Sequence, residues 1–309
     1  MPVYLLAILF SLYGLTYRGP ITVQPESVQL SMAKSMLAHT RVATTQSSAP
    51  YVKTVFAHPS VPITIRSGMV LDVGSGLALW KKNIDEPRPL ASLTKLMTAL
   101  VFLDSQPDWD KPVTFEQGDI DSTTGNTLIV RPGETATVRD VFMASLVASA
   151  NNATVALARS TGLTTQEFVQ RMNDKAKMMS LFLTTFTDVS GLDPGNTSTA
   201  RDYVRLVRTA FNQPRIREAL TTREYSFTTT GVVATHRLYN TDQLLADTSL
   251  DVQAAKTGFI DESGYNFISL ANVNSHEVLV VLLGSVSSAA RFAEAKALFM
   301  WIQDYWRWE

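Results

Sequence analysis

A hydroxyl and an amine close together in an apolar run constrain this chain more than any other feature of its sequence. The stretch Ala91-Ser92-Leu93-Thr94-Lys95 opens a mostly apolar run that continues to Leu103. Because an α-helix turns once per ~3.6 residues, Ser92 and Lys95 would share one face of a buried helix. A serine hydroxyl is a poor nucleophile until a base takes its proton, and a lysine acts as that base only when burial or other cations lower its pKa. The stretch therefore predicts a serine nucleophile and its lysine base.

Taken alone, this pattern is weak. A serine followed by a lysine at this spacing is more typical of a helix cap and a solvated lysine. The same spacing recurs at Ser31 and Lys34, where it predicts nothing. The interpretation therefore depends on what else the chain carries.

Two further stretches carry polar groups suited to the same chemistry. Ser149-Ala150-Asn151 lies between two apolar helical segments, where a serine could relay a proton to a leaving amine and an asparagine could bind a substrate amide. Lys256-Thr257-Gly258 ends an expected strand, whose edge could pair with an extended peptide. There Lys256 would supply positive charge, Thr257 a hydroxyl for a carboxylate, and Gly258 room for close approach. Each stretch alone is more typical of an ordinary loop or strand end.

The composition excludes several classes of function. The chain has 309 residues, 45% hydrophobic content and a formal net charge of -1, so nothing favours nucleic acid as a partner. It has no cysteine, which excludes disulfides and thiolate metal sites. Its four histidines are scattered without metal-ligand spacing. We therefore expect neither a metal nor another cofactor.

The N-terminal segment predicts export. Residues 3–17 are nearly all apolar and are followed by Arg18, a length that suits a signal peptide better than a membrane span. No basic residue precedes them and no clear cleavage site follows, so a buried helix is the alternative. We predict a signal peptide or N-terminal membrane anchor at residues 1–20, which places the rest outside the cytoplasm. Residues 21–62, rich in Ser, Thr, Gln and Pro, are expected to be a linker.

The remaining residues, 63–309, are expected to form one α/β domain. Apolar stretches joined by turn residues predict strands near its start and end, and apolar runs with capping-box-like starts at Thr137, Thr164 and Thr199 predict helices between them. This order implies an antiparallel sheet flanked by helices, with an inserted all-α subdomain at about 105–222. The expected strands are 65–73, 77–82, 252–257, 265–272 and 277–286, and the final helix is 288–308.

The order Ser-x-x-Lys, Ser-x-Asn, Lys-Thr-Gly resembles the signature of penicillin-binding proteins and serine β-lactamases. Three further stretches, Ser190-Gly191-Leu192, Ser198-Thr199-Ala200-Arg201-Asp202 and Gly264-Tyr265-Asn266, make the chain similar to the D-alanyl-D-alanine carboxypeptidase family, peptidase S11. The resemblance covers roughly residues 63–308. It implies the serine β-lactamase/transpeptidase-like fold and acyl transfer on peptidoglycan stem peptides, with β-lactams as covalent inhibitors.

The resemblance also implies a role for each motif residue. Ser92 would attack the carbonyl between two D-alanines while Lys95 takes its proton, and Ser149 would pass a proton to the departing D-alanine. The backbone N–H groups of Ser92 and Phe259 would form the oxyanion hole. The expected substrate-binding residues are Asn151, Lys256, Thr257, Gly258 and Phe259.

Four activities remain open at this point. The family carboxypeptidases of the larger type often carry an arginine upstream of the Lys-Thr-Gly strand, where this chain has Asn240-Thr241-Asp242. That difference, with Thr222-Arg223-Glu224, is more similar to the branch of D-alanyl-D-alanine endopeptidases that cut cross-links. A β-lactamase of the large class that uses a glutamate is less favoured, because no glutamate lies between Asp188 and Asp202. A non-catalytic wall-peptide binder is disfavoured, because every expected polar group is present. We expect a carboxypeptidase first and an endopeptidase second.

Overall fold

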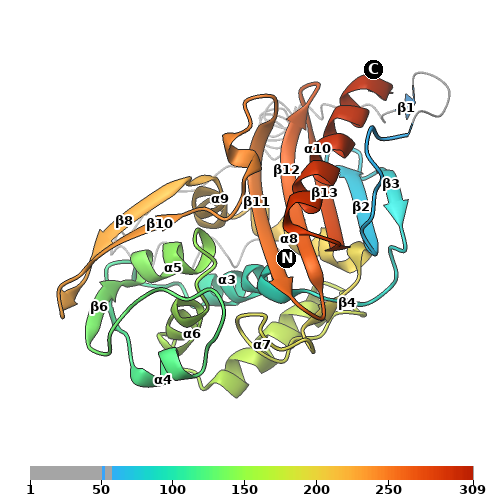
Figure 1. Ribbon diagram of the computed structural model, residues 1–309. Helices are drawn as coiled ribbons and strands as arrows, with labels where there is room; N and C mark the ends of the chain where they lie inside the picture. Colours follow the sequence, from blue (N-terminus) through green and yellow to red (C-terminus); the bar gives the residue numbers. More distant parts are fainter. Residues whose placement is uncertain (1–50, 53–57, 309) are drawn as a thin grey trace, which may run out of the picture. The chain divides into compact units, whose positions relative to one another are not determined.

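The computed structural model describes residues 51–52 and 58–308. Its main sheet has five antiparallel strands in the order β11-β12-β13-β2-β3 (Figure 1). Strand β11 lies at one edge of this sheet; among the residues that the structure describes it pairs with β12 alone, and the 3₁₀ turn η1 (Ala91–Thr94) contacts it. The strands are β2 (Ser67–Asp72), β3 (Ala78–Lys82), β11 (Asp251–Ile260), β12 (Gly264–Val273) and β13 (His276–Ser285).

The structure confirms both predicted hairpins of the sheet. Strands β2 and β3 pair antiparallel, as do β12 and β13. Between β12 and β13, Asn274 and Ser275 have φ values of 51° and 67°. Two consecutive positive φ angles are typical of the type I′ turn, whose twist matches that of the strands it joins.

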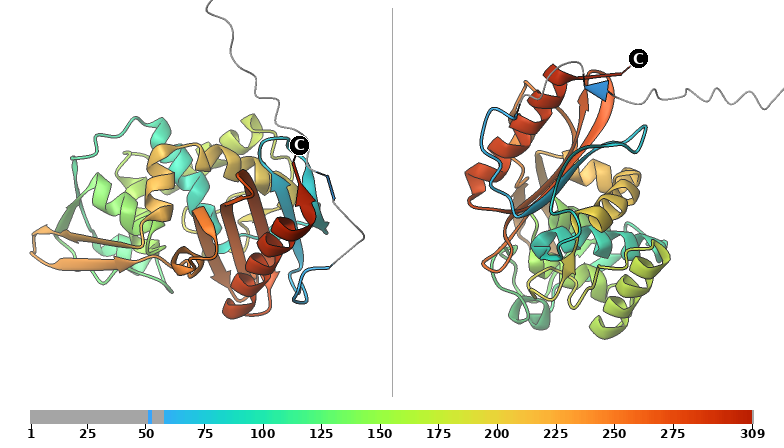
Figure 2. Two further views of the ribbon diagram at one scale, coloured as in Figure 1. Left: turned by 90° about the horizontal axis from the view of Figure 1, so that it is seen from above. Right: turned by 90° about the vertical axis from the view of Figure 1, so that its right-hand side faces the viewer.

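The two faces of the sheet carry separate apolar clusters. Along β13, Val278, Val280 and Leu282 pack with the C-terminal helix α10 (Ser288–Tyr305), while the residues between them pack with the helical region. This division follows from the two-residue period of a strand, which points successive side chains to opposite faces. Figure 2 shows α10 on one face of the sheet and the helical region against the other. The helical region on one face also contacts the edge strand β11, through η1 and α9 (Pro214–Thr221).

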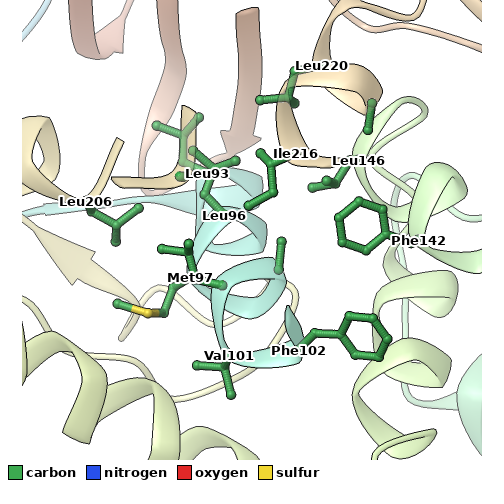
Figure 3. Packing of buried hydrophobic residues seen from close by; sticks show 14 of the residues in the cluster. Leu93, Leu96, Met97, Val101, Phe102, Phe142, Leu146, Leu206, Ile216 and Leu220 are labelled. Carbon is green, nitrogen blue, oxygen red and sulfur yellow. The ribbon is translucent and has the colours of Figure 1, made fainter. Parts of the chain in front are cut away.

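Helix α3 (Lys95–Asp104) is the centre of the helical region and is preceded by η1 (Ala91–Thr94). Residues 95–102 are all buried. Figure 3 shows its apolar side chains meeting Phe142 and Leu146 of α5 and Ile216 and Leu220 of α9. The surrounding helices are α4 (Gln117–Asp121), α5 (Val138–Leu146), α6 (Asn151–Arg159), α7 (Thr165–Met178), α8 (Ala200–Phe211) and α9 (Pro214–Thr221).

The predicted helix starts are confirmed at the level of hydrogen bonds. Thr137 and Thr164 each form a complete capping box with the acidic residue three positions later. Thr199 accepts a hydrogen bond from the Asp202 backbone N–H at the start of α8. These caps satisfy N–H groups that have no partner inside the helix.

The inserted region is not purely helical, contrary to the all-α expectation. Short strands β5 (Pro112–Thr114) and β6 (Glu134–Thr137) pair antiparallel, and β6 also pairs with β9 (Thr230–Gly231). Strands of this length show too little alternation to stand out in a sequence. Three other short elements, β4 (Arg88–Pro89), β7 (Thr197–Ser198) and the 3₁₀ turn η2 (Leu244–Ala246), were also not predicted. The same holds for the hairpin of β8 (Glu224–Thr228) and β10 (Thr235–Tyr239), which follows α9.

The two ends of the described domain lie together. Strand β1 (Tyr51–Val52), inside the predicted linker, pairs antiparallel with β14 (Trp306–Arg307). The predicted leader at 1–20 lies outside the described residues, as does the linker at 21–50 and 53–57. Among residues 51–52 and 58–308, no helix has the length and hydropathy needed to cross a membrane.

Candidate active site

The amine of Lys95 is the point where three separate segments of the chain meet. Its side chain is fully buried, and its Nζ lies 2.9 Å from Ser92 Oγ. The same nitrogen donates hydrogen bonds to Asn151 Oδ1 at 2.6 Å and to the Ser190 carbonyl oxygen at 2.7 Å. Ser92 lies in a 3₁₀ turn rather than in the first turn of an α-helix, as the sequence had suggested. A 3₁₀ helix has about three residues per turn, so two side chains three positions apart point the same way. Ser92 and Lys95 are therefore better aligned than they would be in an α-helix.

The surroundings of Lys95 make its neutral form accessible near neutral pH. Burial lowers the pKa of Lys95 to about 7, and the negative charge of Asp188 opposes this shift. A neutral amine has two N–H groups and one lone pair, whereas an ammonium has three N–H groups and no acceptor. As an ammonium, Lys95 donates to all three oxygens; as a neutral amine that donates to Asn151 and Ser190, it keeps its lone pair for the Ser92 hydroxyl. The site can therefore hold a base against a nucleophile near neutral pH.

Asp188 organises the loop that presents the Ser190 carbonyl to Lys95. One or other of its carboxylate oxygens accepts hydrogen bonds from the backbone N–H groups of Ser190, Gly191 and Leu192, at 2.6 to 2.9 Å. These bonds turn the loop back on itself and fix the direction of the Ser190 carbonyl. The negative charge is therefore close to Lys95 without touching it.

Gly191 lets this loop lie directly against the segment that carries Ser92. Its φ is +89°, and a Cβ atom added there would lie 1.9 Å from the Ala91 carbonyl oxygen. Any other residue would force the two segments apart. Ala91 itself has a positive φ of 49°. The backbone just before the nucleophile is thus held in a conformation that few residues with a Cβ adopt.

The second hydroxyl and second amine of the predicted motifs also lie together. Lys256 Nζ donates a hydrogen bond to Ser149 Oγ at 2.7 Å, and both side chains are buried. Burial holds the pKa of Lys256 well below its ordinary value, and the positive charges of Lys95 and Arg291 act in the same direction. A carboxylate bound beside this amine would raise its pKa again, because an opposite charge favours the ammonium form.

The rest of the Lys-Thr-Gly stretch lines the edge of β11. Thr257 Oγ1 lies 2.6 Å from Thr241 Oγ1, so the hydroxyls of two segments form one pair. A Cβ on Gly258 would lie 2.8 Å from the Leu90 carbonyl oxygen, which explains the need for glycine beside η1. Phe259 is 45% exposed, and its ring stacks on Tyr265.

The structure therefore brings the predicted polar side chains into two adjoining groups. The first contains Ser92, Lys95 and Asn151, and the second contains Ser149 and Lys256. Their proximity follows from three contacts: η1 against β11, α5 against α6, and α3 against α6. This is an arrangement in which one amine can activate a hydroxyl while a second hydroxyl, beside a second amine, can handle a proton on the other side.

A sequence model of peptidase S11, described as D-alanyl-D-alanine carboxypeptidase, matches residues 53–287. The chain belongs to the peptidase S11 family. It is a serine D-alanyl-D-alanine peptidase of the penicillin-binding class. The family assignment agrees with the resemblance seen in the sequence motifs.

Relatives with two different activities have similar sequence identity to this chain. The chain is 31% identical to a D-alanyl-D-alanine endopeptidase of Pseudomonas aeruginosa, over 77% of this chain and 76% of that protein. It is also 31% identical to the D-alanyl-D-alanine carboxypeptidase DacC of Escherichia coli, over 77% of this chain and 61% of that protein. Sequence identity alone does not separate the two activities.

Solved structures support the fold of the family. The crystal structure of the Streptomyces K15 DD-transpeptidase has a TM-score of 0.74 and 27% sequence identity, covering 79% of this chain and 98% of that chain. This confirms the predicted α/β fold class, an antiparallel sheet flanked by helices.

The sequence did not predict that three charged residues, Asp188, Asp242 and Arg291, lie near the active site. Nothing in the sequence marked Asp188 as part of the site except its position two residues before Ser190. Asp242 is buried, which raises the pKa of its carboxyl to about 6. Arg291 comes from α10 on the far side of the sheet, and its Nη1 lies 3.3 Å from the Gly258 carbonyl oxygen. The roles of Asp242 and Arg291 depend on contacts across the sheet, which no local pattern encodes.

The charge of Asp188 should be visible in the pH dependence of acylation. Removing it in Asp188→Asn lowers the pKa of Lys95, because the charge that opposes the burial effect is gone. A step that needs the neutral amine gains rate as pH rises through that pKa. We expect a midpoint near 7 for acylation of the wild type by a fluorescent penicillin, and a lower midpoint for Asp188→Asn. The plateau rate should fall roughly tenfold as loop hydrogen bonds are lost.

Asp193→Asn is the matched control, because this exposed carboxylate in the same loop accepts a hydrogen bond from Gly195 and its charge is not among those that shift Lys95. It should keep the wild-type midpoint. An unchanged midpoint in Asp188→Asn would show that this carboxylate has no electrostatic effect on the lysine.

Proposed function

We propose that this protein hydrolyses the bond between the two D-alanines of peptidoglycan stem peptides, through an acyl-enzyme at Ser92. The observation that carries the proposal is the geometry of Lys95, whose two N–H groups have acceptors other than Ser92. Its lone pair is left to accept the Ser92 proton at a separation of 2.9 Å. According to this proposal, the protein is a serine-type D-alanyl-D-alanine carboxypeptidase.

In the first half of the reaction, Ser92 Oγ forms a bond to the carbonyl carbon of the penultimate D-alanine as its proton moves to Lys95. The carbonyl oxygen becomes an oxyanion, which is bound by the backbone N–H groups of Ser92 and Phe259. The N-terminal ends of η1 and α3 add peptide dipoles that favour this negative charge. The Asn151 amide orients the acyl part of the substrate.

The tetrahedral intermediate collapses when the C–N bond breaks and the leaving amine takes a proton. Ser149, whose hydroxyl lies 2.7 Å from Lys256 Nζ, relays to this amine the proton that Lys95 took from Ser92, so Lys95 is neutral again when the acyl-enzyme has formed. Lys256 and Thr257 bind the carboxylate of the departing D-alanine, and Gly258 permits its close approach. Water then attacks the ester carbonyl, Lys95 takes the water's proton and returns one to Ser92, and the shortened peptide is released.

Covalent labelling tests the nucleophile. A fluorescent penicillin should label the wild type, and Ser92→Ala should stay unlabelled and lose peptide hydrolysis by at least roughly a thousandfold. Ser31→Ala is the matched control, because Ser31 and Lys34 have the same spacing as Ser92 and Lys95. Labelling of Ser92→Ala would exclude Ser92 as the acylated residue, and rapid loss of the wild-type label would favour a β-lactamase.

A D-alanyl-D-alanine endopeptidase that cleaves cross-links is the second candidate. The observation that favours it is Thr241, which pairs with Thr257 where larger carboxypeptidases of the family carry an arginine. The similarity to the Pseudomonas aeruginosa endopeptidase over 76% of its length points the same way. A hydroxyl pair binds a carboxylate without the fixed bidentate geometry of a guanidinium.

Purified muropeptides distinguish the two activities. Release of free D-alanine from pentapeptide monomers, with dimers left intact, is the expected outcome for a carboxypeptidase. Conversion of cross-linked dimers to monomers at an equal or greater rate would assign the endopeptidase activity instead. Both products can be followed by chromatography, and Ser92→Ala provides the blank.

We propose that the protein acts on the outer side of the cytoplasmic membrane, because the proposed substrate is peptidoglycan and residues 3–17 are nearly all apolar. Residues 1–20 serve as export signal or as membrane anchor. Cell fractionation of the full chain should recover it outside the cytoplasm, and deletion of residues 1–20 should retain it inside. Recovery of the truncated chain outside would overturn this role for the segment.

A further inference from the structure

A groove with a volume of about 660 Å³ runs along strand β10. Its lining includes every residue from Val233 to Tyr239, together with Thr241. The mechanism above uses none of the β10 residues. A groove that follows a strand along its whole length raises the question of whether the strand edge itself is available to a ligand.

The hydrogen-bond register of the hairpin identifies the open edge of β10. The Asn240 N–H donates to the Arg223 carbonyl oxygen, and the Thr229 N–H donates to the Ala234 carbonyl oxygen. In an antiparallel pair, bonded and non-bonded residues alternate, so the even-numbered residues of β10 bond to β8. The N–H and C=O groups of the odd-numbered residues, Thr235, Arg237 and Tyr239, therefore point away from β8. Within the described part of the chain, β10 has no second strand partner.

The opposite wall of the groove is attached directly to the Ser149-Ala150-Asn151 stretch. It is formed by residues 126–129 and Arg131. The Asn151 N–H donates to the Asn126 carbonyl oxygen at 2.8 Å, and the Leu128 N–H donates to Asn152 Oδ1 at 2.9 Å. These bonds hold the wall at a fixed distance from the start of α6.

The groove adjoins the leaving-group side of the active site. Ala148 and Ala150, on either side of Ser149, belong to its lining. So does Thr241, whose hydroxyl pairs with that of Thr257. Ser149 and Thr257 are the residues that the proposed mechanism assigns to the leaving amine and its carboxylate. A free D-alanine would occupy only this end of the groove.

The side chains along the groove suit a peptide. Ile129, Val233 and Tyr239 are 92%, 75% and 58% exposed, an apolar surface that a bound chain would cover. Arg131 is exposed on the same wall, and its guanidinium forms no ion pair among the described residues. Apolar contacts beside a free cation fit a peptide that carries additional carboxylates.

We propose that this groove binds the peptide chain that carries the leaving amine, extended as an added strand along the open edge of β10. Addition of a strand to an open edge uses main-chain hydrogen bonds for affinity and alternate side chains for selectivity. The inference rests on the proposed function, since it takes its direction from the assignment of Ser149 and Thr257 to the leaving group. It applies to cross-linked stem peptides, whose leaving group is a second peptide, and so to the second candidate activity; dimers left intact by the wild type would overturn it.

Two substrates with the same acyl part test this inference: a pentapeptide monomer, which releases D-alanine, and a cross-linked dimer, which releases a second stem peptide. The variant is Arg237→Pro, which removes one outward N–H from β10 while the bonds to β8 remain. Proline is tolerated on edge strands when its nitrogen faces outward. Arg237→Ala is the matched control, because it loses the same side chain and its ion pair with Glu224 but keeps the N–H. Relative to Arg237→Ala, we expect Arg237→Pro to lower the dimer-to-monomer ratio of kcat/KM about three- to tenfold.

A second pair of variants tests the apolar surface without touching the backbone. Val233→Ser should lower the same ratio about twofold or more, because a covered apolar side chain is lost. Met178→Ser, at a position 84% exposed and absent from the groove lining, should leave the ratio unchanged. Acylation by a fluorescent penicillin reports that each variant is folded.

The outcomes separate this inference from the proposed function. If Ser92→Ala abolishes hydrolysis of both substrates but Arg237→Pro and Arg237→Ala have the same ratio, the groove does not bind the leaving peptide and the inference fails alone. If Ser92→Ala still hydrolyses either substrate, the proposed function fails. A rise in the ratio in Arg237→Pro would also overturn the inference.

Discussion

The site depends on one constraint: a buried amine whose hydrogen-bond acceptors come from distant parts of the chain. Lys95 can be buried because Asn151 and the Ser190 carbonyl accept its N–H groups. Without such partners, a buried polar group costs roughly 1–3 kcal/mol or more. The packing of α3 against α6, and the fold of the loop at 188–196, are therefore requirements of the same interaction. The sheet adds the second amine, Lys256, at the edge that faces this cluster.

Much of the fold and of the site could be predicted, because the relevant signals are local. Strands of the sheet are largely apolar and lie next to turn residues, and Thr137, Thr164 and Thr199 cap helices where the sequence indicated. The motif residues were also identified in advance, since a family resemblance links three distant stretches. Their functional roles remain proposals, but the structure brings Ser92 and Lys95, and Ser149 and Lys256, within hydrogen-bond distance.

What the sequence did not indicate depends on geometry that has no local pattern. Asp188 matters because backbone N–H groups of the next residues turn toward it, and such a turn is not visible in residue types alone. Arg291 reaches Gly258 across the sheet. The groove beside β10 has walls about 100 residues apart in the chain, and each wall alone is an ordinary loop or short hairpin. These features arise from tertiary packing, so they appear only when the segments are assembled.

The short ladder between β1 and β14 has a mechanical consequence. Tyr51 pairs with Arg307, and Val52 pairs with Trp306, so the outward-going ends of both strands leave the ladder on the same side. Tension applied between them would peel the pairs apart one after another instead of shearing them together. The ladder would therefore open at low force. While it opens, the hydrogen bonds of the five-stranded sheet that carries Lys256 would bear none of that force.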